Sequence, residues 1–201
     1  MDWDSDVNSY IVTLADGFPE ELRPKTCLKC KSEAFQQKHA HFKRSIYTLL
    51  GLTSLTIYRF LCTTCKATYS LLPSFFRKNH TIANEVQEVV VARMDSGETM
   101  TQAGEDICLG VAVSRKTVRR WNDFWGTLVD TQEEMVVQQA LILMPALTLP
   151  VGKAKAAAAS TPYRWLSYIW QQITVSGNFG PDCLFNMLFR LYLSMSVSAV
   201  P

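Results

Sequence analysis

The chain has 201 residues, of which 48% are hydrophobic and 19% are charged, and its formal net charge is +2. This composition supplies enough apolar side chains for a packed core and excludes a chain that is disordered throughout. The charge is unevenly distributed, because residues 1–22 contain six acids and no Lys or Arg, whereas residues 23–80 contain eleven Lys or Arg and one acid. Such a basic block is typical of proteins that bind polyanions, although a single Lys run is more often a solvated surface.

The first residues, MDWDSDVNSY in the acidic segment 1–22, have neither the positive region nor the apolar region of a secretory signal. We therefore expect a reducing, cytoplasmic location. Structural disulfides are rare in such a compartment, where paired Cys-x-x-Cys motifs more often bind metal or carry out redox chemistry. Cys108 and Cys183 stand alone in apolar surroundings and are expected to be plain buried side chains.

Residues 23–76 are predicted to form a small β module. The stretches RSIYTLL at 44–50 and SLTIYRFLC at 54–62 are rich in β-branched and aromatic residues, and ATYSLLP closes the block at Pro73. The module has too few apolar positions for a large core of its own. A bound metal supplies folding energy in domains of this kind.

Two Cys-x-x-Cys pairs, CLKC and CTTC, lie within this module and supply Cys27, Cys30, Cys62 and Cys65. Zinc prefers four ligands in a tetrahedron, and two such turns near strand ends complete a closed site of the zinc-ribbon type. A redox pair would need a thiolate at a helix N-terminus, which neither pair has. Replacement of a ligand by His39 or His41 stays an alternative, but imidazoles in a solvated basic loop are the simpler interpretation. We predict one structural Zn²⁺ and no catalytic metal.

Residues 77–129 are predicted to form three helices. Ile82, Val86, Val89 and Val90 follow the helical period, with Thr81 as a candidate N-cap and Gly97 beyond the end. A second helix begins with the capping-box pattern Thr99-x-x-Gln102 and is expected to stop near Gly110. A third is capped by Ser114, and its apolar face is formed by Val118, Trp121, Trp125 and Leu128. The three helices predict a helix-turn-helix-like unit.

The third helix is basic on its free side. Arg115, Lys116 and Arg119 occupy early positions, where arginine can bridge the O6 and N7 atoms of guanine in the major groove. Arg120 is expected to position the helix on the backbone. The RKNH stretch at 77–80, with Arg77 and Lys78, is a candidate phosphate clamp. An Arg-rich helix face is often only solvated, but the basic block before it favours binding of double-stranded DNA.

After residue 129 the pattern weakens. We expect a linker over residues 130–162 and an apolar helical tail over residues 163–201, with helices near 163–176 and 182–199. Asn186, Arg190 and several serines interrupt the last segment, which makes membrane insertion the less favoured interpretation. The alternative is a helical hairpin that packs on the three-helix unit or forms a homodimer through the C-terminal helices.

Taken together, the first Cys-x-x-Cys pair, IYRFLCTTCKATYSLLPSFF and SRKTVRRW resemble the zinc-ribbon plus helix-turn-helix front portion of bacterial insertion-sequence transposases. They are similar also to an uncharacterised bacterial family of stand-alone proteins with this arrangement. The resemblance covers residues 20–128 and implies zinc ligation by the four cysteines and DNA reading by residues 115–120. The stretch LGVAVS is two residues longer than the corresponding turn in such motifs.

The expected class is α+β: a four-cysteine zinc ribbon, a helix-turn-helix-like unit and an apolar helical tail. Residues 130–201 are too few for the ribonuclease-H-like domain of a transposase, whose separated carboxylates bind two metals. We therefore expect a non-enzymatic, sequence-specific DNA-binding protein, nucleoid-associated, that acts as a transcriptional regulator or a mobile-element accessory. A protein-interaction adaptor and a remnant of a strand-transfer recombinase are the alternatives.

Overall fold

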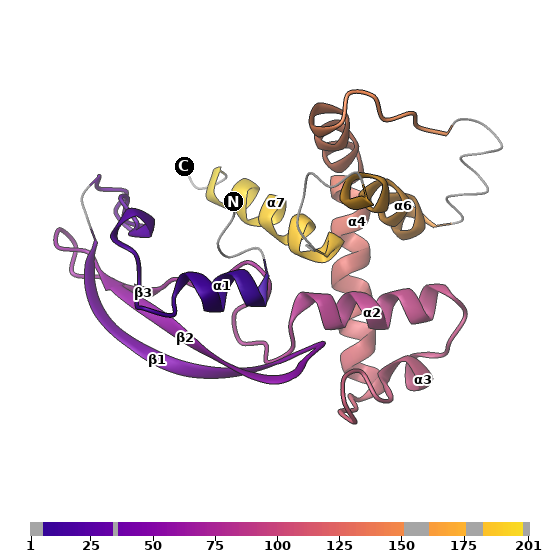
Figure 1. Cartoon of the computed structure of the whole chain (residues 1–201), viewed down its shortest axis with the longest axis horizontal. Helices are drawn as coiled ribbons and strands as arrows, with labels where there is room; N and C mark the ends of the chain where they lie inside the picture. Colours follow the sequence, from indigo (N-terminus) through magenta and orange to yellow (C-terminus); the bar gives the residue numbers. More distant parts are fainter. Residues whose placement is uncertain (1–5, 34–35, 151–160, 176–182, 199–201) are drawn as a thin grey trace. The chain divides into compact units, whose positions relative to one another are not determined.

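A computed structural model of the chain describes residues 6–33, 36–150, 161–175 and 183–198. The chain forms two compact units, Met1–Ala83 and Asn84–Pro201, and each is described by itself. The first contains a three-stranded antiparallel sheet, and the described elements of the second are all helical (Figure 1). The predicted α+β class is therefore confirmed.

The sheet of the first unit consists of β1 (Gln37–Thr48), β2 (Gly51–Leu61) and the short β3 (Thr68–Ser70), in the order β1-β2-β3. β1 and β2 form a hairpin in which Thr48 pairs with Gly51, whose φ of 102° suits a glycine. Both predicted strands are present, but β1 begins seven residues earlier than the predicted start at residue 44. The first half of β1, Gln37 to Lys43, is exposed throughout. Its sequence therefore lacks the alternation of apolar and polar residues that predicts a strand.

The described residues of the acidic segment 1–22 belong to this unit. Helix α1 (Val7–Thr13) is capped by Asp6, whose carboxylate accepts the Asn8 and Ser9 N–H groups at 2.9 and 3.0 Å. The Tyr10 hydroxyl donates to the Thr56 carbonyl of β2 at 2.8 Å. A 3₁₀ turn (Glu20–Leu22) follows the helix. Apolar side chains before, within and after the sheet form one buried cluster, which includes Val7, Tyr10, Leu14, Phe18, Ile46, Leu55, Ile57, Phe60, Phe75 and Phe76.

The second unit begins with α2 (Asn84–Asp95), α3 (Met100–Gly104) and α4 (Arg115–Leu143), which pack on one another. The predicted N-caps of the second and third helices are confirmed. Thr99 and Gln102 form a capping box, and the Ser114 side chain accepts the Thr117 N–H at 3.3 Å. α2 starts three residues after the predicted cap Thr81, and Val89, expected on its buried face, is exposed.

The two later helices differ in length from the prediction. α3 ends at Gly104 instead of near Gly110, because the Gly104 carbonyl accepts the Val113 N–H at 2.8 Å and Asp106, Leu109 and Gly110 have positive φ angles. α4 does not end near residue 129 but continues to Leu143, so the first part of the predicted linker 130–162 is helical. Its buried face is continued by Gln132, Val136 and Ala140. Residues 151–160 of that linker lie outside the described residues.

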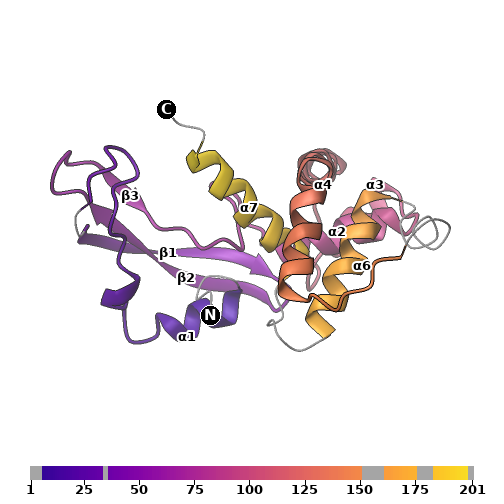
Figure 2. The same cartoon turned by 90° about the horizontal axis from the view of Figure 1, so that it is seen from above.

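Helices α6 (Pro162–Val175) and α7 (Leu184–Ser198) pack on α4, as the hairpin interpretation of the tail predicted (Figure 2). The rings of Trp125 and Phe185 stack with their centroids 4.0 Å apart. The Glu88 carboxylate of α2 accepts the Phe185 N–H at 2.8 Å and so caps the start of α7. None of the described helices combines the length and the apolar character needed to cross a membrane. The homodimer stays a prediction.

Candidate metal centre and basic surfaces

The two Cys-x-x-Cys pairs form two closely similar turns of the first unit. In the first turn, Cys27 N–H donates to the Ser32 carbonyl at 3.0 Å and Lys31 N–H to the Cys27 carbonyl at 3.0 Å. In the second, Cys62 N–H donates to Ala67 at 2.9 Å and Lys66 N–H to Cys62 at 3.0 Å. The residue after each pair is a lysine in the left-handed region, with φ of 58° for Lys31 and 59° for Lys66. The two turns therefore have similar backbone conformations, and each supplies two cysteine sulfurs to the same site.

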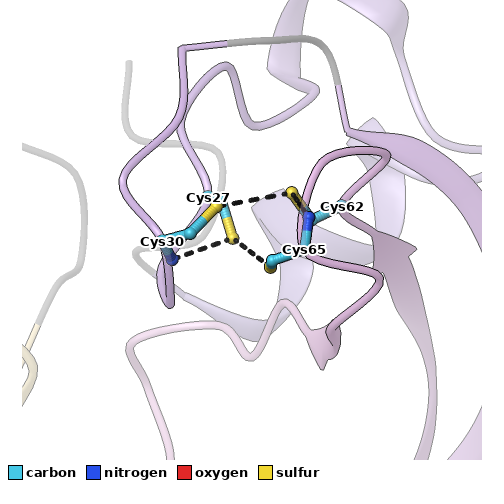
Figure 3. Close-up of side chains that lie close together, drawn as sticks. All are labelled: Cys27, Cys30, Cys62 and Cys65. Carbon is cyan, nitrogen blue, oxygen red and sulfur yellow. Dashed lines mark hydrogen bonds between the residues drawn. The ribbon is translucent and has the colours of Figure 1, made fainter.

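The sulfurs of the two turns approach one another across a small gap (Figure 3). The Cys27 and Cys65 sulfurs are 3.7 Å apart, as are those of Cys30 and Cys62, and all four ligand atoms lie within 4.8 Å of one another. A disulfide would require about 2.05 Å, and all four cysteines are free. Four thiolates at about 2.3 Å from one tetrahedral ion are separated by about 3.8 Å. The geometry therefore fits a four-thiolate metal centre.

The local hydrogen bonds and charges also suit a cation. The Cys65 N–H donates to the Cys62 sulfur at 3.5 Å. This hydrogen bond is the main cause that lowers the pKa of Cys62 to about 5. The Ala67 N–H lowers the pKa of Cys65, but desolvation and the thiols of Cys30, Cys62 and Cys27 outweigh it and raise this pKa to about 11. Four thiolates repel one another, so full ionisation needs a compensating positive ion.

Other groups near the sulfurs complete the centre. Backbone N–H groups of Lys29 and Cys30 point to the Cys27 sulfur at 3.3 and 3.5 Å. The Ser32 hydroxyl lies 3.2 Å from the Cys30 sulfur, and this contact lowers the pKa of Cys30. Such neighbours orient the ligands of a metal. Among the described residues, the four cysteines are the group of His, Cys, Asp or Glu close enough to hold a metal. His39 and His41 lie outside this group.

The four predicted DNA-contacting residues of the third helix lie together at the start of α4. Arg115, Lys116, Arg119 and Arg120 are all exposed. At about 100° per residue, they fall within an arc of about 140° on the side of the helix opposite to its buried residues. Val118, Trp121 and Trp125 fix the other side of the helix in the core of the second unit. The positive end of the helix dipole lies beside these four cations.

The exposed face of α4 changes sign along the helix. Beyond Arg120 the same face carries Asp123, Asp130 and Glu134, all exposed. Carboxylates at these positions repel phosphate, whereas the first two turns attract it. A polyanion would therefore be held by the start of the helix and not along its whole length.

The two basic residues of the candidate phosphate clamp at residues 77–80 differ in their exposure to solvent. Lys78 is exposed, but Arg77 is only 9% exposed, and burial lowers the pKa of its guanidinium to about 10. His80 N–H donates to the Arg77 carbonyl at 3.1 Å, which closes a turn with Lys78 at its tip. The prediction that Arg77 contacts phosphate is not supported by this placement, because its side chain packs inside the first unit. Lys78 remains available for such a contact.

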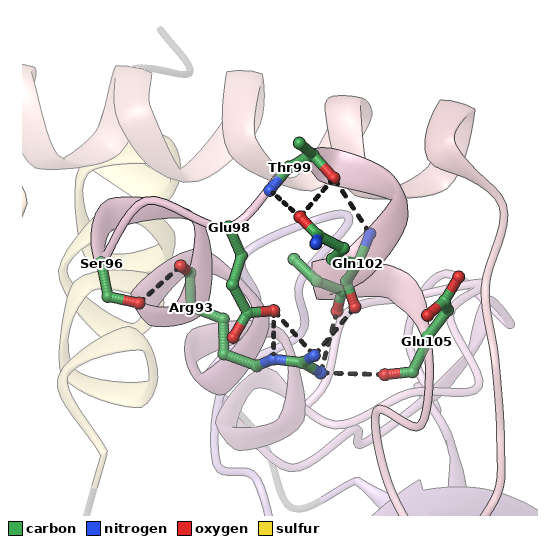
Figure 4. Close-up of polar contacts among 7 residues, drawn as sticks. Arg93, Ser96, Glu98, Thr99, Gln102 and Glu105 are labelled. Carbon is green, nitrogen blue, oxygen red and sulfur yellow. Dashed lines mark hydrogen bonds and ion pairs between the residues drawn. The ribbon is translucent and has the colours of Figure 1, made fainter.

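Arg93 fixes the turn between α2 and α3 and was not foreseen from the sequence (Figure 4). Its guanidinium pairs with Glu98 at 2.7 Å and donates to the carbonyls of Gln102 at 2.8 Å and Glu105 at 2.9 Å. It therefore satisfies carbonyl groups at the end of α3, which a helix cannot satisfy by itself. The pattern of a basic residue near a helix end was visible, but its partners depend on the tertiary fold.

No protein-family model, no curated protein and no solved structure matches this chain. The resemblance to transposase front portions therefore stays an expectation from the motifs. The fold and the site define an α+β chain with a four-cysteine centre compatible with a structural metal in its first unit.

Proposed function

We propose that this chain is a zinc-stabilised protein that binds double-stranded DNA and has no catalytic domain of its own. The observation that carries the proposal is the cluster Arg115, Lys116, Arg119 and Arg120, exposed together on the first two turns of a helix whose opposite face is buried. A rigid helix with cations at its start is suited to entry into the major groove.

Zinc is the proposed metal because the donor set is four cysteine sulfurs within 4.8 Å of one another, and zinc prefers four such ligands. With four protein ligands the ion has no open position, so its role is to stabilise the first unit. The lysines that follow each Cys-x-x-Cys pair offset part of the negative charge of the centre. The metal therefore supports binding without taking part in it.

The mechanism has two stages. The first is electrostatic capture of the DNA backbone by exposed cations, which is independent of sequence and weakens as salt is added. The second is reading of base edges by Arg115 and Arg119, with Lys116 and Arg120 holding phosphates. The carboxylates from Asp123 onward favour docking by the first turns of α4. In a bacterial cell this activity would place the protein at the nucleoid, as a regulator or as an accessory of a mobile element.

A selection from randomised duplexes at physiological salt tests the proposal. We expect an enriched motif, a specific affinity lowered about 10-fold or more by Arg115→Ala or Arg119→Ala, and little change on unrelated duplexes. Lys78→Ala should weaken binding to both kinds of duplex about equally. Equal losses on both duplexes for all three variants would contradict the assignment of α4 as the reading helix.

A protein-interaction adaptor is the second candidate, and one observation favours it. Leu49, Leu50 and Leu52, at the tip of the β1–β2 hairpin, are 47%, 73% and 64% exposed. Exposed apolar groups gathered at one place often mark contacts with another protein. Absence of salt-dependent DNA binding by the zinc-loaded chain would favour this function over the first.

A further inference from the structure

The sheet of the first unit carries a row of cationic and aromatic side chains that is separate from the proposed DNA-reading helix α4. We call it the basic strip and define it by Arg59, Phe42, Arg44 and Lys78. Phe42 is 37% exposed, and Arg59 and Lys78 are exposed as well. The strip lies on β1, β2 and the turn at residues 77–80.

Two contacts link members of the strip to each other and to the turn at residues 77–80. Phe42 and Arg44 are two residues apart on β1 and therefore point to the same face of the sheet. Arg59 lies opposite Ala40, and its guanidinium is 5.6 Å from the centre of the Phe42 ring. Arg44 donates to the His80 carbonyl at 2.8 Å, within the turn that exposes Lys78. The row thus runs from the sheet to the tip of that turn.

The two arginines are held by aromatic rings. Arg59 packs on Phe42, and the Arg44 guanidinium lies 5.0 Å from the centre of the Phe76 ring. A guanidinium stacked on a ring keeps N–H groups at its edge for an oxygen ligand, and its fixed position reduces the entropy lost on binding. This arrangement suits phosphate, which arginine can bind with two parallel hydrogen bonds.

The charge around the strip identifies the partner class. The sequence contains no Asp or Glu between Glu33 and Glu85, whereas it contains seven Lys or Arg in that interval: Lys38, Lys43, Arg44, Arg59, Lys66, Arg77 and Lys78. A protein partner would have to be unusually acidic to match this surface. A nucleic acid backbone carries a regular row of negative charges.

We propose that the basic strip binds the sugar-phosphate backbone of duplex DNA, as a second contact that is independent of α4 and of base sequence. The inference rests on the proposed function and assigns its capture stage to named residues. Arg59 and Lys78 contact phosphates, Phe42 holds Arg59 in position, and Arg44 joins the sheet to the turn.

The test uses the full zinc-loaded chain and a duplex of random sequence, with binding measured by fluorescence anisotropy over a series of salt concentrations. Arg59→Gln with Lys78→Gln removes two charges and should reduce the slope of log K against log salt by about 2, since each phosphate contact contributes about 0.9. Lys25→Gln, an exposed lysine outside the strip, is the matched control and should leave the slope nearly unchanged. Phe42→Leu keeps all charges and should weaken binding, because the Arg59 guanidinium loses the ring that holds it in position.

Several outcomes separate this inference from the function on which it rests. An unchanged slope in the double variant, or an equal change in Lys25→Gln, overturns the strip. If the double variant keeps its slope while Arg115→Ala loses the selected duplex, the strip is wrong and DNA reading by α4 stands. If the wild-type chain binds no duplex, both are wrong. Zinc content and circular dichroism confirm that each variant is folded.

Discussion

Cys62 directly follows β2 and lies close to three other thiols, so a metal bound here would stabilise the fold of the first unit. A structural zinc ion contributes folding energy directly, about 10–16 kcal/mol in small zinc-binding peptides. Cys62→Ser removes one of four ligands, so we expect loss of bound zinc and unfolding of the first unit. Metal content together with the near-ultraviolet circular dichroism of the chain measures both effects.

Cys108→Ser is the matched control for this prediction. Cys108 is a buried thiol of the second unit and is not part of the four-cysteine group. This variant should keep one zinc per chain even if it lowers the stability of its own unit. Full zinc content in Cys62→Ser, or equal loss in both variants, would contradict the four-thiolate centre.

His80 gives the first unit a predicted dependence on pH. Burial lowers the pKa of His80, and the charges of Arg77 and Arg44 lower it further in the folded chain. The unfolded chain has an ordinary histidine pKa of about 6.5 and takes up the proton first as the pH falls. Stability is therefore expected to fall as the pH decreases below about 6.5 toward the lowered pKa of the folded state.

Release of zinc bound at the four cysteines would also destabilise the chain in acid, so the comparison must be made with a variant. Denaturant unfolding of the zinc-loaded wild-type chain and of His80→Gln between pH 7.5 and pH 5.5 isolates the histidine. We expect the wild-type chain to lose more stability than the variant over this range. Parallel pH profiles would show that His80 does not carry the effect.

Sequence reasoning at the scale of single residues worked where the pattern is local. The Cys-x-x-Cys spacing was sufficient to predict that the four cysteine sulfurs lie together. Thr99 and Ser114 were identified as N-caps from neighbouring residues alone. The sequence predicts Arg77 in a phosphate clamp, whereas the fold buries it. Burial of a charged residue depends on which distant segments cover it, and the sequence pattern does not contain that information.

At the scale of the elements, the close packing of the end of α3 against the start of α4 requires a glycine at position 104. A Cβ added at Gly104 would lie 2.7 Å from the Val113 carbonyl oxygen and 3.0 Å from a methyl group of Val118. Gly104→Ala is therefore expected to lower the free energy of unfolding by about 1–3 kcal/mol, as overpacking does. It should also weaken DNA binding, because it displaces the start of α4.

Gly126 provides a matched control in the middle of α4. A Cβ at Gly126 meets nothing within 4 Å. Alanine there should raise stability by about 0.5–1 kcal/mol, because glycine is unfavourable inside a helix. Thermal unfolding of both variants tests the pair, and a Gly104→Ala chain as stable as the wild type would contradict the close packing.

The change of charge along α4 gives a prediction for the element as a whole. Asp123 lies within about 6 Å of Arg119 along the helix axis, inside the screening length of physiological salt, whereas Glu134 lies about 21 Å beyond Arg120. Asp123→Asn should raise the affinity for unrelated duplexes by about two- to five-fold, and Glu134→Gln should change it little. Anisotropy titrations at physiological salt measure both, and an equal increase in the two variants would argue against docking by the first turns of the helix.

Elements were predictable where hydrophobic periodicity is strong. The β1–β2 hairpin, α2, α6 and α7 were all expected near their observed positions. The first half of β1 was missed because its residues are exposed on both sides and show no period of two. The length of α4 was missed because Gln132 and other polar residues after Val129 interrupt the apolar pattern, although Gln132 is buried and continues the packed face.

At the scale of the whole molecule, the net charge of +2 conceals a strong separation of charge. Six acids lie in residues 1–22 and six more in residues 85–106, while cations gather in the basic strip and at the start of α4. Each unit therefore presents its own positive surface. We predict that both surfaces contribute to binding of one class of ligand, duplex DNA.

The salt dependence of DNA binding by the zinc-loaded chain tests this claim most directly. With about four to six phosphate contacts, the affinity for a selected duplex should fall by about 100-fold to 2,000-fold between 50 and 200 mM salt, in a linear plot of log K against log salt. Absence of binding at low salt, or an affinity that does not change over this range, would contradict the account.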